Sequence, residues 1–324
     1  MITHPYQDIY DEINTLKQKT NTILLSHYYM SPELQVPFSQ GGVSDFLGDS
    51  LALSVSATRT EAAHIILCGV RFMAETAKIL NPTKRVYIPD YEAGCSLAES
   101  ITAEQVREIK KKYPGAPVIA YINTYAETKA ECDIICTSRN ALPIASSFKE
   151  DTLIFLPDEF MGQNLRKKIE SETGKRLILW NGRCEVHEQF RGEEMLAMQN
   201  QHPDAEVLLH WEVPQTTVDS ALENQKGVLG STSDIIGYVK NSSAKKFILA
   251  SECDLGAVLK STYADREFIT PCIKCPHMKK ITLQNTLDLL KKIEQKQVVS
   301  EEIILENELI NRARIPLERM MQFT

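Results

Sequence analysis

Short apolar runs alternate along the chain with longer stretches in which apolar residues recur at helical spacing. Runs rich in β-branched and aromatic residues predict buried strands, and helical spacing predicts amphipathic helices. We expect strands at Thr22–Leu25, His64–Leu67, Val86–Ile88, Val118–Ala120, Thr152–Leu156, Leu177–Trp180, Val207–Leu209 and Phe247–Ala250. We expect helices at Tyr6–Lys19, Phe72–Leu80, Ala103–Tyr113, Gln163–Ser171 and Thr282–Gln297. This alternation favours an α/β fold in which helices cover parallel sheets.

A repeat of about 90 residues underlies the alternation. Polar triplets follow three of the expected strands at that spacing, namely His27-Tyr28-Tyr29, Tyr121-Ile122-Asn123 and His210-Trp211-Glu212. Turns with small hydroxyl side chains recur at a similar interval, at Gly48-Asp49-Ser50, Thr137-Ser138 and Gly230-Ser231-Thr232. Cysteines follow the last strand of each repeat, at Cys95, Cys184 and Cys275. Three independent features in one order indicate three similar folding units.

The period is too long for a common solenoid repeat, so we expect three similar three-layer αβα domains with short parallel sheets. We expect a pseudo-threefold arrangement of these domains around one central site. The expected domains comprise residues 1–84 plus 268–324, residues 85–171, and residues 172–267. Ligand groups in parallel α/β sheets gather at the carboxyl ends of strands, so this site should carry the polar triplets.

Each polar triplet should place two side chains on one face of its strand end, because residues two apart in a strand project to the same side. The pairs that project together are His27 with Tyr29, Tyr121 with Asn123, and His210 with Glu212. A single histidine of this kind is more often a hydrogen-bonded structural residue. Three polar pairs at matched positions favour a shared pocket with acid–base groups.

The hydroxyl turns each precede a segment with helical periodicity. Their candidate anion-binding residues are Ser50, Ser138, Ser231 and Thr232. Helix N-termini present free N–H groups that favour phosphate and carboxylate groups. Serine and threonine also cap helices at this position, and the two roles are compatible.

Composition narrows the classes of function. The net charge of -7 argues against a nucleic-acid-binding surface, which normally needs a basic patch. The basic run Lys110–Lys112 lies in an expected helix and is typical of a solvated face. Neither a signal-peptide pattern nor a long apolar run is visible. We therefore expect a cytoplasmic protein with neither a nucleic-acid nor a membrane partner.

Eight cysteines need an explanation in a cytoplasmic protein, where structural disulfides are rare. Three thiolates at the repeat spacing suit an iron–sulfur cluster, and three thiolates with a histidine would suit zinc. Spacing alone leaves both metals open. Cys272 and Cys275 are also spaced as a redox pair able to form a disulfide. The remaining cysteines are expected to be buried apolar side chains, and they are Cys68, Cys132, Cys136 and Cys253.

A series of short segments, in one order over nearly the whole chain, resembles the quinolinate synthase family. The segments are Ser26–Tyr29, Asp45–Ser50, Gly69–Lys78, Pro89–Cys95, Tyr121–Thr124, Cys136–Ala141, Trp180–His187, Gly230–Thr232 and Cys275–Lys279. The resemblance implies three αβα domains around an interface that holds a cluster. It also implies a transferase that condenses iminoaspartate with dihydroxyacetone phosphate to quinolinate, with release of phosphate and water, in NAD biosynthesis.

The resemblance further implies a [4Fe-4S] cluster held by Cys95, Cys184 and Cys275, with Cys272 outside the ligand set. The fourth iron would stay open and act as a Lewis acid toward substrate. The implied catalytic residues are Glu212 as general acid or base, with Tyr29, His27 and His210 as proton carriers. The implied substrate-binding residues are His27, Ser50, Tyr121, Asn123, Ser138, His210, Glu212, Ser231 and Thr232. An aspartate oxidase or dehydrogenase is the expected functional partner that supplies iminoaspartate.

The chain departs from the family at one place near the expected site. Most members have His-Pro-Glu-Cys where this chain has His210-Trp211-Glu212-Val213. The acid–base pair is retained, while a large aromatic residue enters next to it. An alternative is therefore that the chain is a paralogue of the family, which keeps the cluster but uses a related pair of dicarboxylate and carbonyl substrates. A non-catalytic iron–sulfur or zinc sensor is disfavoured, because a sensor has no need of the polar pairs.

Overall fold

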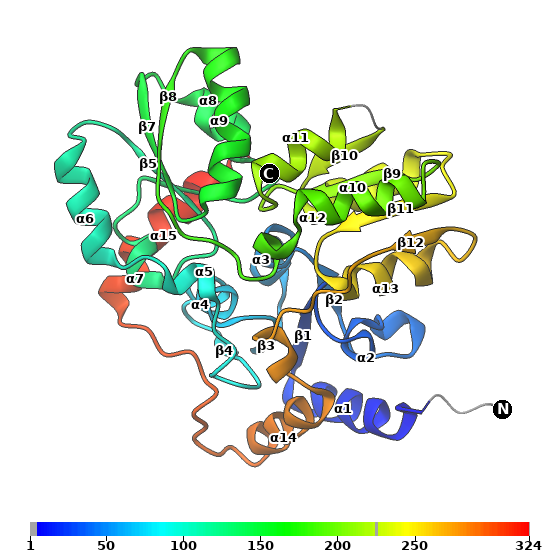
Figure 1. The fold of residues 1–324 in the computed structure, drawn as a ribbon. Coiled ribbons are helices and arrows are strands. Elements are labelled where there is room, and N and C mark those ends of the chain that lie inside the picture. Colours follow the sequence, from blue (N-terminus) through cyan, green and yellow to red (C-terminus); the bar gives the residue numbers. More distant parts are fainter. Residues whose placement is uncertain (1–4, 224–225, 324) are drawn as a thin grey trace. The chain divides into compact units, whose positions relative to one another are not determined.

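The computed structural model describes residues 5–223 and 226–323, and it shows an α/β protein (Figure 1). The described residues form three separate sheets of four parallel strands each. Helices flank all three sheets. The expected fold class of three similar αβα units is therefore confirmed.

The first sheet has the strand order β2-β1-β3-β4. Its strands are β1 (Thr22–His27), β2 (Phe46–Gly48), β3 (His64–Cys68) and β4 (Arg85–Tyr87). The second sheet has the order β6-β5-β7-β8, formed by β5 (Val118–Tyr121), β6 (Ile134–Cys136), β7 (Thr152–Leu156) and β8 (Arg176–Leu179). The third has the order β10-β9-β11-β12, formed by β9 (Glu206–His210), β10 (Gly227–Gly230), β11 (Lys246–Ala250) and β12 (Glu267–Ile269).

The three sheets share one topology, which confirms the repeat seen in the sequence. In each sheet the first strand lies in the interior, between the second strand on one side and the third on the other. The chain therefore reverses its direction of winding beside the first strand. In parallel sheets this switch point opens a crevice at the carboxyl ends of the first and third strands, where ligands bind.

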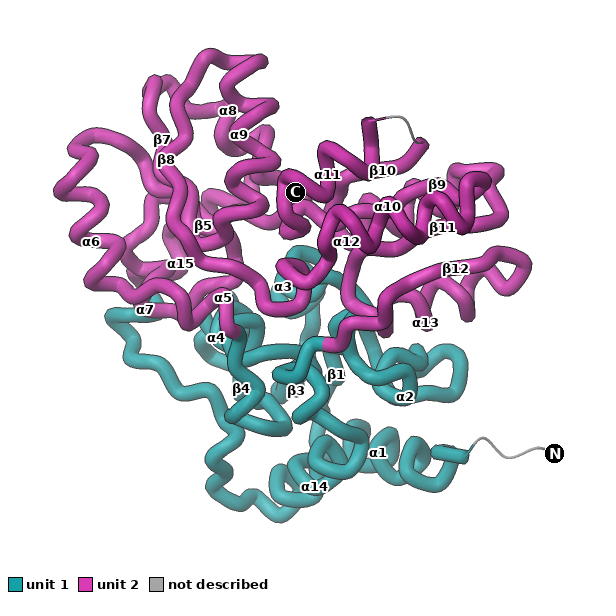
Figure 2. The backbone as a smooth tube through the Cα atoms, in the orientation of Figure 1, with its two compact units in different colours: residues 1–95, 275–310 teal, residues 96–274, 311–324 magenta. Residues whose placement is uncertain are grey.

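The chain forms two compact units, which Figure 2 shows in teal and magenta. Unit 1 comprises residues 1–95 and 275–310 and contains the first sheet. Its helices are α1 (Gln7–Thr20), α2 (Pro32–Gln35), α3 (Ser50–Arg59), α4 (Arg71–Leu80) and α14 (Leu283–Glu294). Helices α1 and α14 pack side by side, and α3 packs on α4 (Figure 1).

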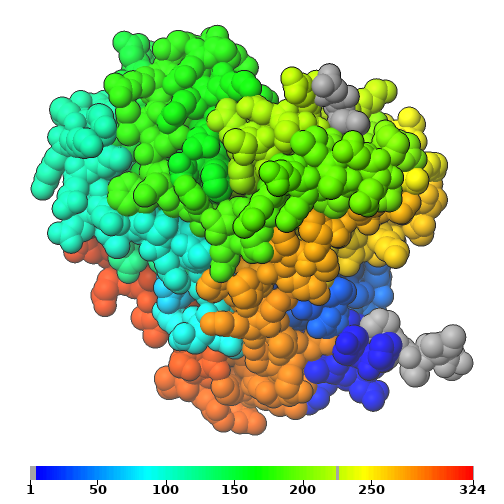
Figure 3. All heavy atoms as spheres, viewed as in Figure 1, coloured from blue at the N-terminus to red at the C-terminus, as the bar shows by residue number. Residues whose placement is uncertain are grey.

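Unit 2 comprises residues 96–274 and 311–324 and contains the second and third sheets. Its helices include α5 (Ser96–Glu99), α6 (Ala103–Lys112), α7 (Ala126–Lys129), α8 (Ala141–Ser147) and α9 (Glu159–Thr173). Further along are α10 (Gly192–Gln201), α11 (Gln215–Leu222), α12 (Thr232–Asn241), α13 (Cys253–Thr262) and most of α15 (Asn307–Met321). In Figure 3 green atoms, to which α9 and α10 contribute, form much of the visible surface of this unit.

All eight strands expected from the sequence are present, within two residues at each end. The five expected helices are also present, although α9 begins at Glu159, four residues before the expected Gln163. The sequence does not predict β2, β6, β10 and β12, which are edge strands of three or four residues. Strands this short carry little pattern, although β4 and β8 are predicted at the same length. β10 also begins and ends with glycine, a residue that is unfavourable in strands.

Strand pairing also bears on the expected domain boundaries. β4 (Arg85–Tyr87) pairs with β3 in the first sheet, and β8 (Arg176–Leu179) pairs with β7 in the second. The first two sheets therefore extend past residues 84 and 171, where the expected ranges divide the chain.

No helix in the described part of the chain is long and apolar enough to cross a membrane.

We predict that Gly227→Ala, in the edge strand β10, lowers stability. A Cβ atom at this position would overlap the main-chain carbonyl oxygen of Val207 in the adjacent strand β9, so the backbone would have to shift. The expected loss is about 1–3 kcal/mol in the free energy of unfolding, measured by chemical denaturation.

The matched control is Gly237→Ala, within helix α12, where a Cβ atom would have no neighbour within 4 Å. Alanine stabilises a helix interior by about 0.5–1 kcal/mol relative to glycine, so this variant should unfold at higher denaturant. Equal effects of the two substitutions would contradict the close pairing of β9 with β10.

Candidate active site

The candidate active site in unit 2 is built around the carboxylate of Glu212, which is 3% exposed. The hydroxyl of Tyr121, the last residue of β5, donates a hydrogen bond to Glu212 Oε1 at 2.7 Å. His187 Nδ1 lies 3.3 Å from Oε2, and His210 Nδ1 lies 3.5 Å from Oε1. The second and third sheets thus contribute polar groups from the carboxyl ends of β5 and β9 to one buried cluster.

Two imidazole rings flank this carboxylate. The rings of His187 and His210 stack with centroids 4.5 Å apart and planes 19° from parallel. His187 Nδ1 also lies 3.3 Å from the Sγ of Cys184. The ligand atoms of Cys184, His187 and Glu212 lie within 4.8 Å of one another, a grouping that could hold a metal ion.

The environment of Glu212 keeps it ionised. Burial alone would raise the pKa of this carboxyl, because a charge is costly away from water. The charges of His187 and His210 and the hydrogen bonds from His187 and Tyr121 outweigh burial and lower the pKa to about 2. Glu212 is therefore a carboxylate throughout the physiological pH range.

Asp158 is a second buried carboxyl group near Glu212. It follows β7 and caps the N-terminus of α9, where its Oδ1 accepts a hydrogen bond from Met161 N at 2.7 Å. Burial and then the negative charge of Glu212 raise its pKa well above the usual value. Tyr121 thus ends β5 and Asp158 follows β7, and these two strands border the switch point of the second sheet.

Unit 1 repeats part of this arrangement at the end of β1. The rings of His27 and Tyr29 meet edge to face with centroids 4.6 Å apart, and both residues are buried. Tyr29 N donates to His27 Nδ1 at 3.1 Å, as Glu212 N donates to His210 Nδ1 at 3.4 Å. A ring nitrogen that accepts from a backbone N–H carries no proton in neutral histidine, so these bonds favour the proton on Nε2 in both histidines.

The hydroxyl turns do lie at helix starts. Ser231 caps α12 through Asp234 N, and Thr232 is the first residue of that helix. Ser50 begins α3, but the cap is Asp49, which accepts from Ala52 N at 2.9 Å. Ser138 lies in the turn just before α8. The Oδ1 atom of Asn123 is buried without a hydrogen-bond partner among the described residues.

The eight cysteines fall into three classes. Cys68, Cys132 and Cys136 are fully buried, and burial raises the pKa of each thiol, that of Cys68 and Cys132 to about 12. These three match the expectation of inert core residues. A second class is partly exposed and takes part in no disulfide, and its members are Cys95, Cys184 and Cys275.

The third class corrects two expectations. The sequence predicts that Cys253 is a buried apolar residue, and the Cys-x-x-Cys spacing indicates Cys275 as the partner of Cys272 in any disulfide. The structure instead joins Cys253 to Cys272, whose Cα atoms are 4.4 Å apart. The partner of Cys272 lies 19 residues away, at the start of α13, which spacing within the motif does not indicate.

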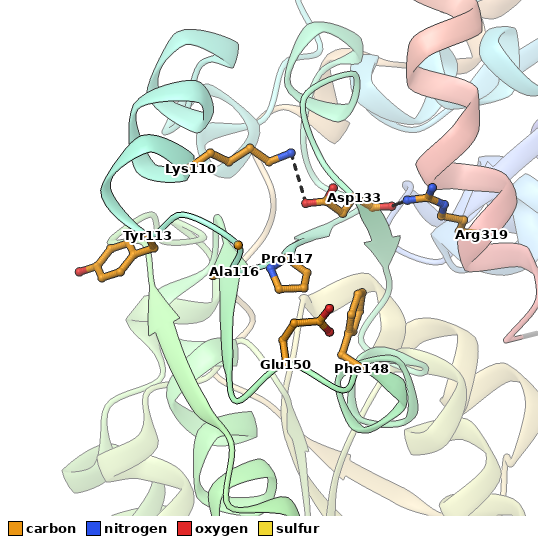
Figure 4. Close-up of a pocket in the computed structure, with 9 residues that line it drawn as sticks. Lys110, Tyr113, Ala116, Pro117, Asp133, Phe148, Glu150 and Arg319 are labelled. Carbon is orange, nitrogen blue, oxygen red and sulfur yellow. Dashed lines mark hydrogen bonds and ion pairs between the residues drawn. The ribbon is translucent and has the colours of Figure 1, made fainter.

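A surface pocket of about 430 Å³ lies elsewhere in unit 2 (Figure 4). Its lining includes Lys110, Tyr113, Asp133, Phe148, Glu150 and Arg319. Lys110 forms an ion pair with the Asp133 carboxylate at 3.2 Å, and Arg319 donates to the Asp133 carbonyl at 2.6 Å. The pocket borders the amino ends of β5, β6 and β7, opposite to the end where parallel sheets bind ligands, so we do not assign the site to it.

Comparison with known proteins identifies the family. Residues 11–322 match the family model described as NadA, quinolinate synthetase A protein. The chain belongs to the quinolinate synthase family. The quinolinate synthase of Sinorhizobium fredii is 40% identical over 309 residues, which cover 95% of this chain and 80% of that protein. Quinolinate synthase 2 of Mesorhizobium japonicum is 43% identical over 311 residues, which cover 96% of this chain and 90% of that protein.

A third relative, the quinolinate synthase of Agrobacterium fabrum, is 42% identical over 317 residues, covering 98% of this chain and 86% of that protein. Likeness of this extent spans both units of the present chain. The family that the sequence segments indicate is therefore confirmed.

Sequence reasoning missed two members of the candidate site. His187 follows Cys184 by three residues, within a 3₁₀ turn, and this Cys-x-x-His spacing is itself a metal-ligand signal. Asp158 follows β7, the strand that neighbours β5 across the switch point, so strand topology would have placed it beside Tyr121. Trp211, the family departure, packs with its ring 4.9 Å from Lys168 Nζ.

The sorting of the cysteines predicts an order of labelling by a thiol reagent in cluster-free protein. Cys95, Cys184 and Cys275 should react under native conditions because they are partly exposed. Cys68, Cys132 and Cys136 should react only after unfolding, since burial raises their pKa. Peptide mass spectrometry measures each site separately, and labelling of Cys272 without a reductant would contradict its bond to Cys253.

Proposed function

We propose that this protein is a quinolinate synthase that condenses iminoaspartate with dihydroxyacetone phosphate to quinolinate, releasing phosphate and water. The observation that carries the proposal is the buried cluster of Tyr121, His187, His210 and Glu212 in a chain of the quinolinate synthase family. The reaction requires protons to be removed from carbon and donated to departing oxygen atoms. Positioned imidazole, phenol and carboxylate groups perform such transfers.

Each member of the cluster has a distinct task in this proposal. Glu212 is held as a carboxylate, so it orients the imidazoles and stabilises the positive charge when one of them takes a proton. Tyr121 is fixed by its bond to Glu212 and presents a phenol group beside it. His210 and His187 carry the protons, and in unit 1 His27 and Tyr29 form the corresponding pair.

Binding of the substrates needs groups for two carboxylates and one phosphate. Helices α3 and α12 each begin with a hydroxyl residue, Ser50 in the first and Thr232 in the second, and their first turns favour anions. Ser231 and Ser138 lie in the corresponding turns. Asn123 contributes an amide whose buried oxygen has no hydrogen-bond partner among the described residues.

The thiols fit an iron–sulfur cluster, whose ligands are thiolates. Cys95, Cys184 and Cys275 are partly exposed and outside any disulfide, whereas the other five cysteines are either fully buried or joined in a disulfide. Each of the three comes after the last strand of one sheet. We propose that these three hold a [4Fe-4S] cluster and leave one iron open. When bound, that iron supplies a Lewis acid for substrate oxygen or nitrogen.

The cellular setting follows from the same proposal. Quinolinate is a precursor of the nicotinamide ring, so the protein would act in NAD biosynthesis in the cytoplasm. Iminoaspartate is an imine that water destroys, and an oxidase or dehydrogenase acting on aspartate would have to supply it. Trp211 and Val213 replace the usual family residues on both sides of Glu212, but neither side chain belongs to the cluster around its carboxylate.

We predict that Cys95→Ser, Cys184→Ser and Cys275→Ser each abolish assembly of a full cluster, because a serine oxygen is a poor ligand for iron in place of a thiolate. Iron and sulfide counts after anaerobic reconstitution measure the effect. Cys272→Ser is the control and should keep full iron content. Full iron in one of the first three variants would remove that cysteine from the ligand set.

We predict that Glu212→Gln lowers kcat by roughly 10²–10⁴-fold, because the amide cannot stabilise a protonated imidazole. Iron content and the denaturation midpoint should stay close to those of the wild type. The matched control is Glu206→Gln at the start of β9, the strand that Glu212 follows, where the carboxylate accepts from Ser242 Oγ at 2.6 Å. Unchanged turnover in Glu212→Gln would contradict the proposed role.

A further inference from the structure

The turn after the first strand of each sheet is built in the same way. The first residue of the turn donates its N–H to the last residue of the neighbouring edge strand. These bonds join Tyr28 N to Gly48 O at 3.2 Å, Ile122 N to Cys136 O at 2.8 Å, and Trp211 N to Gly230 O at 3.2 Å. The central residues of the three turns are Tyr29, Asn123 and Glu212, all proposed above as site residues.

In the first sheet a buried amide joins the two carbonyl groups on either side of the central residue. Gln35 Nε2 donates to Tyr28 O at 2.7 Å and to Met30 O at 2.8 Å. The acceptors lie seven and five residues before Gln35, which is the last residue of α2. Tyr29 is therefore held between two bonded carbonyls.

The second sheet repeats the arrangement with a different side chain. Lys129 Nζ donates to Ile122 O at 2.8 Å and to Thr124 O, again from seven and five residues further along. Lys129 is also the last residue of its short helix, α7, and is 0% exposed. Lysine and glutamine thus perform the same bonding at the same position of the repeat.

In the third sheet the same spacing leads to Val218, a buried apolar residue that cannot donate. The two carbonyls nevertheless accept hydrogen bonds, because Asn164 donates to both of them. Asn164 lies in α9, the helix that connects β7 to β8 of the second sheet. Asn164 Nδ2 donates to Trp211 O and to Val213 O, both at 2.8 Å. In this sheet the donor comes from a different position of the chain, yet it bonds to the same two carbonyls. This indicates that the turn requires these bonds, and that they do not arise only because the repeats have similar sequences.

We propose that Gln35, Lys129 and Asn164 are positioning residues, which we call carbonyl clamps. Each fixes the direction of the side chain at the centre of its turn: Gln35 for Tyr29, Lys129 for Asn123, and Asn164 for Glu212. Buried carbonyls without partners are unfavourable, so a turn that loses its clamp rotates to find new ones. The effect on catalysis rests on the proposed function, whereas the effect on the turns does not.

The sharpest substitution is Asn164→Asp, which keeps the size of the side chain and replaces the donor with an acceptor facing two carbonyl oxygens. The control is Gln199→Glu in the same unit, where another buried amide donates to a carbonyl, Ala221 O, at 2.8 Å, away from the site. Both variants should lower the denaturation midpoint. Only Asn164→Asp should lower kcat, by roughly tenfold or more, because misplacing a reacting group by about 1 Å costs up to 10²-fold.

Lys129 gives a second, independent test through substrate binding. Lys129→Met removes the donor and should raise KM roughly tenfold while kcat changes little, because Asn123 holds substrate and transfers no proton. Lys129→Gln is the matched variant, since glutamine already spans the same two carbonyls in the first sheet. It should restore KM to within about threefold of the wild type.

Hydrogen–deuterium exchange of the turn peptides separates this proposal from the proposed function. Peptides containing residues 210–213 should exchange faster in Asn164→Asp than in the wild type and in Gln199→Glu, whether or not the protein makes quinolinate. If wild-type protein makes no quinolinate, the proposed function is wrong. The exchange result still tests whether Asn164 holds the turn in place. Unchanged exchange in Asn164→Asp, or equal KM in Lys129→Met and Lys129→Gln, would overturn the proposal.

Discussion

The structure depends on how the first strand of each sheet ends. This strand lies inside its sheet, so its carboxyl end opens between two neighbours at the point where the winding of the chain reverses. The backbone turn there has carbonyl groups that are buried and need partners. Gln35, Lys129 and Asn164 supply them, and between each pair of bonded carbonyls lies a residue that we propose for the site. Topology selects the position, and the clamps fix the direction of the side chain.

The second constraint is electrostatic. A buried carboxylate is unfavourable unless charged or donor groups surround it. Glu212 has Tyr121, His187 and His210 around it, and they hold its pKa at about 2 despite burial. Burial and then the negative charge of Glu212 raise the pKa of the nearby Asp158. The pKa values of two carboxyl groups in one unit are thus shifted in opposite directions, a difference that enzymes use to separate acid from base.

Most strands and two of the polar pairs could be predicted from the sequence, because burial and periodicity determine which residue types occur within one element. The strand Thr152–Leu156 is an almost continuous apolar run, and its pattern predicts both ends to the residue. The polar pairs His27 with Tyr29 and His210 with Glu212 follow from alternation along a strand. Edge strands such as Gly227–Gly230 leave almost no pattern, since they are short and only half buried.

Pairings between distant segments could not be predicted in this way. The bond from Cys253 to Cys272, the bonds from Asn164 to the turn at Glu212, and the approach of His187 to Glu212 all join elements far apart in the chain. Periodicity describes one element at a time and holds no information on which elements meet. The strand order of the sheet supplies that information. The position of Asp158 beside Tyr121, for example, can be inferred only once β7 is known to pair with β5.

We propose that a thiolate-bound iron–sulfur cluster and the buried acid–base group around Glu212 act in one reaction. The most direct measurement is anaerobic purification of the wild-type protein, counting of iron and sulfide, and an assay with freshly generated iminoaspartate and dihydroxyacetone phosphate. We expect iron and sulfide in the ratio of one [4Fe-4S] cluster per chain, together with formation of quinolinate and phosphate. Protein that is folded but binds no iron, or that holds a full cluster and makes no quinolinate, would contradict it.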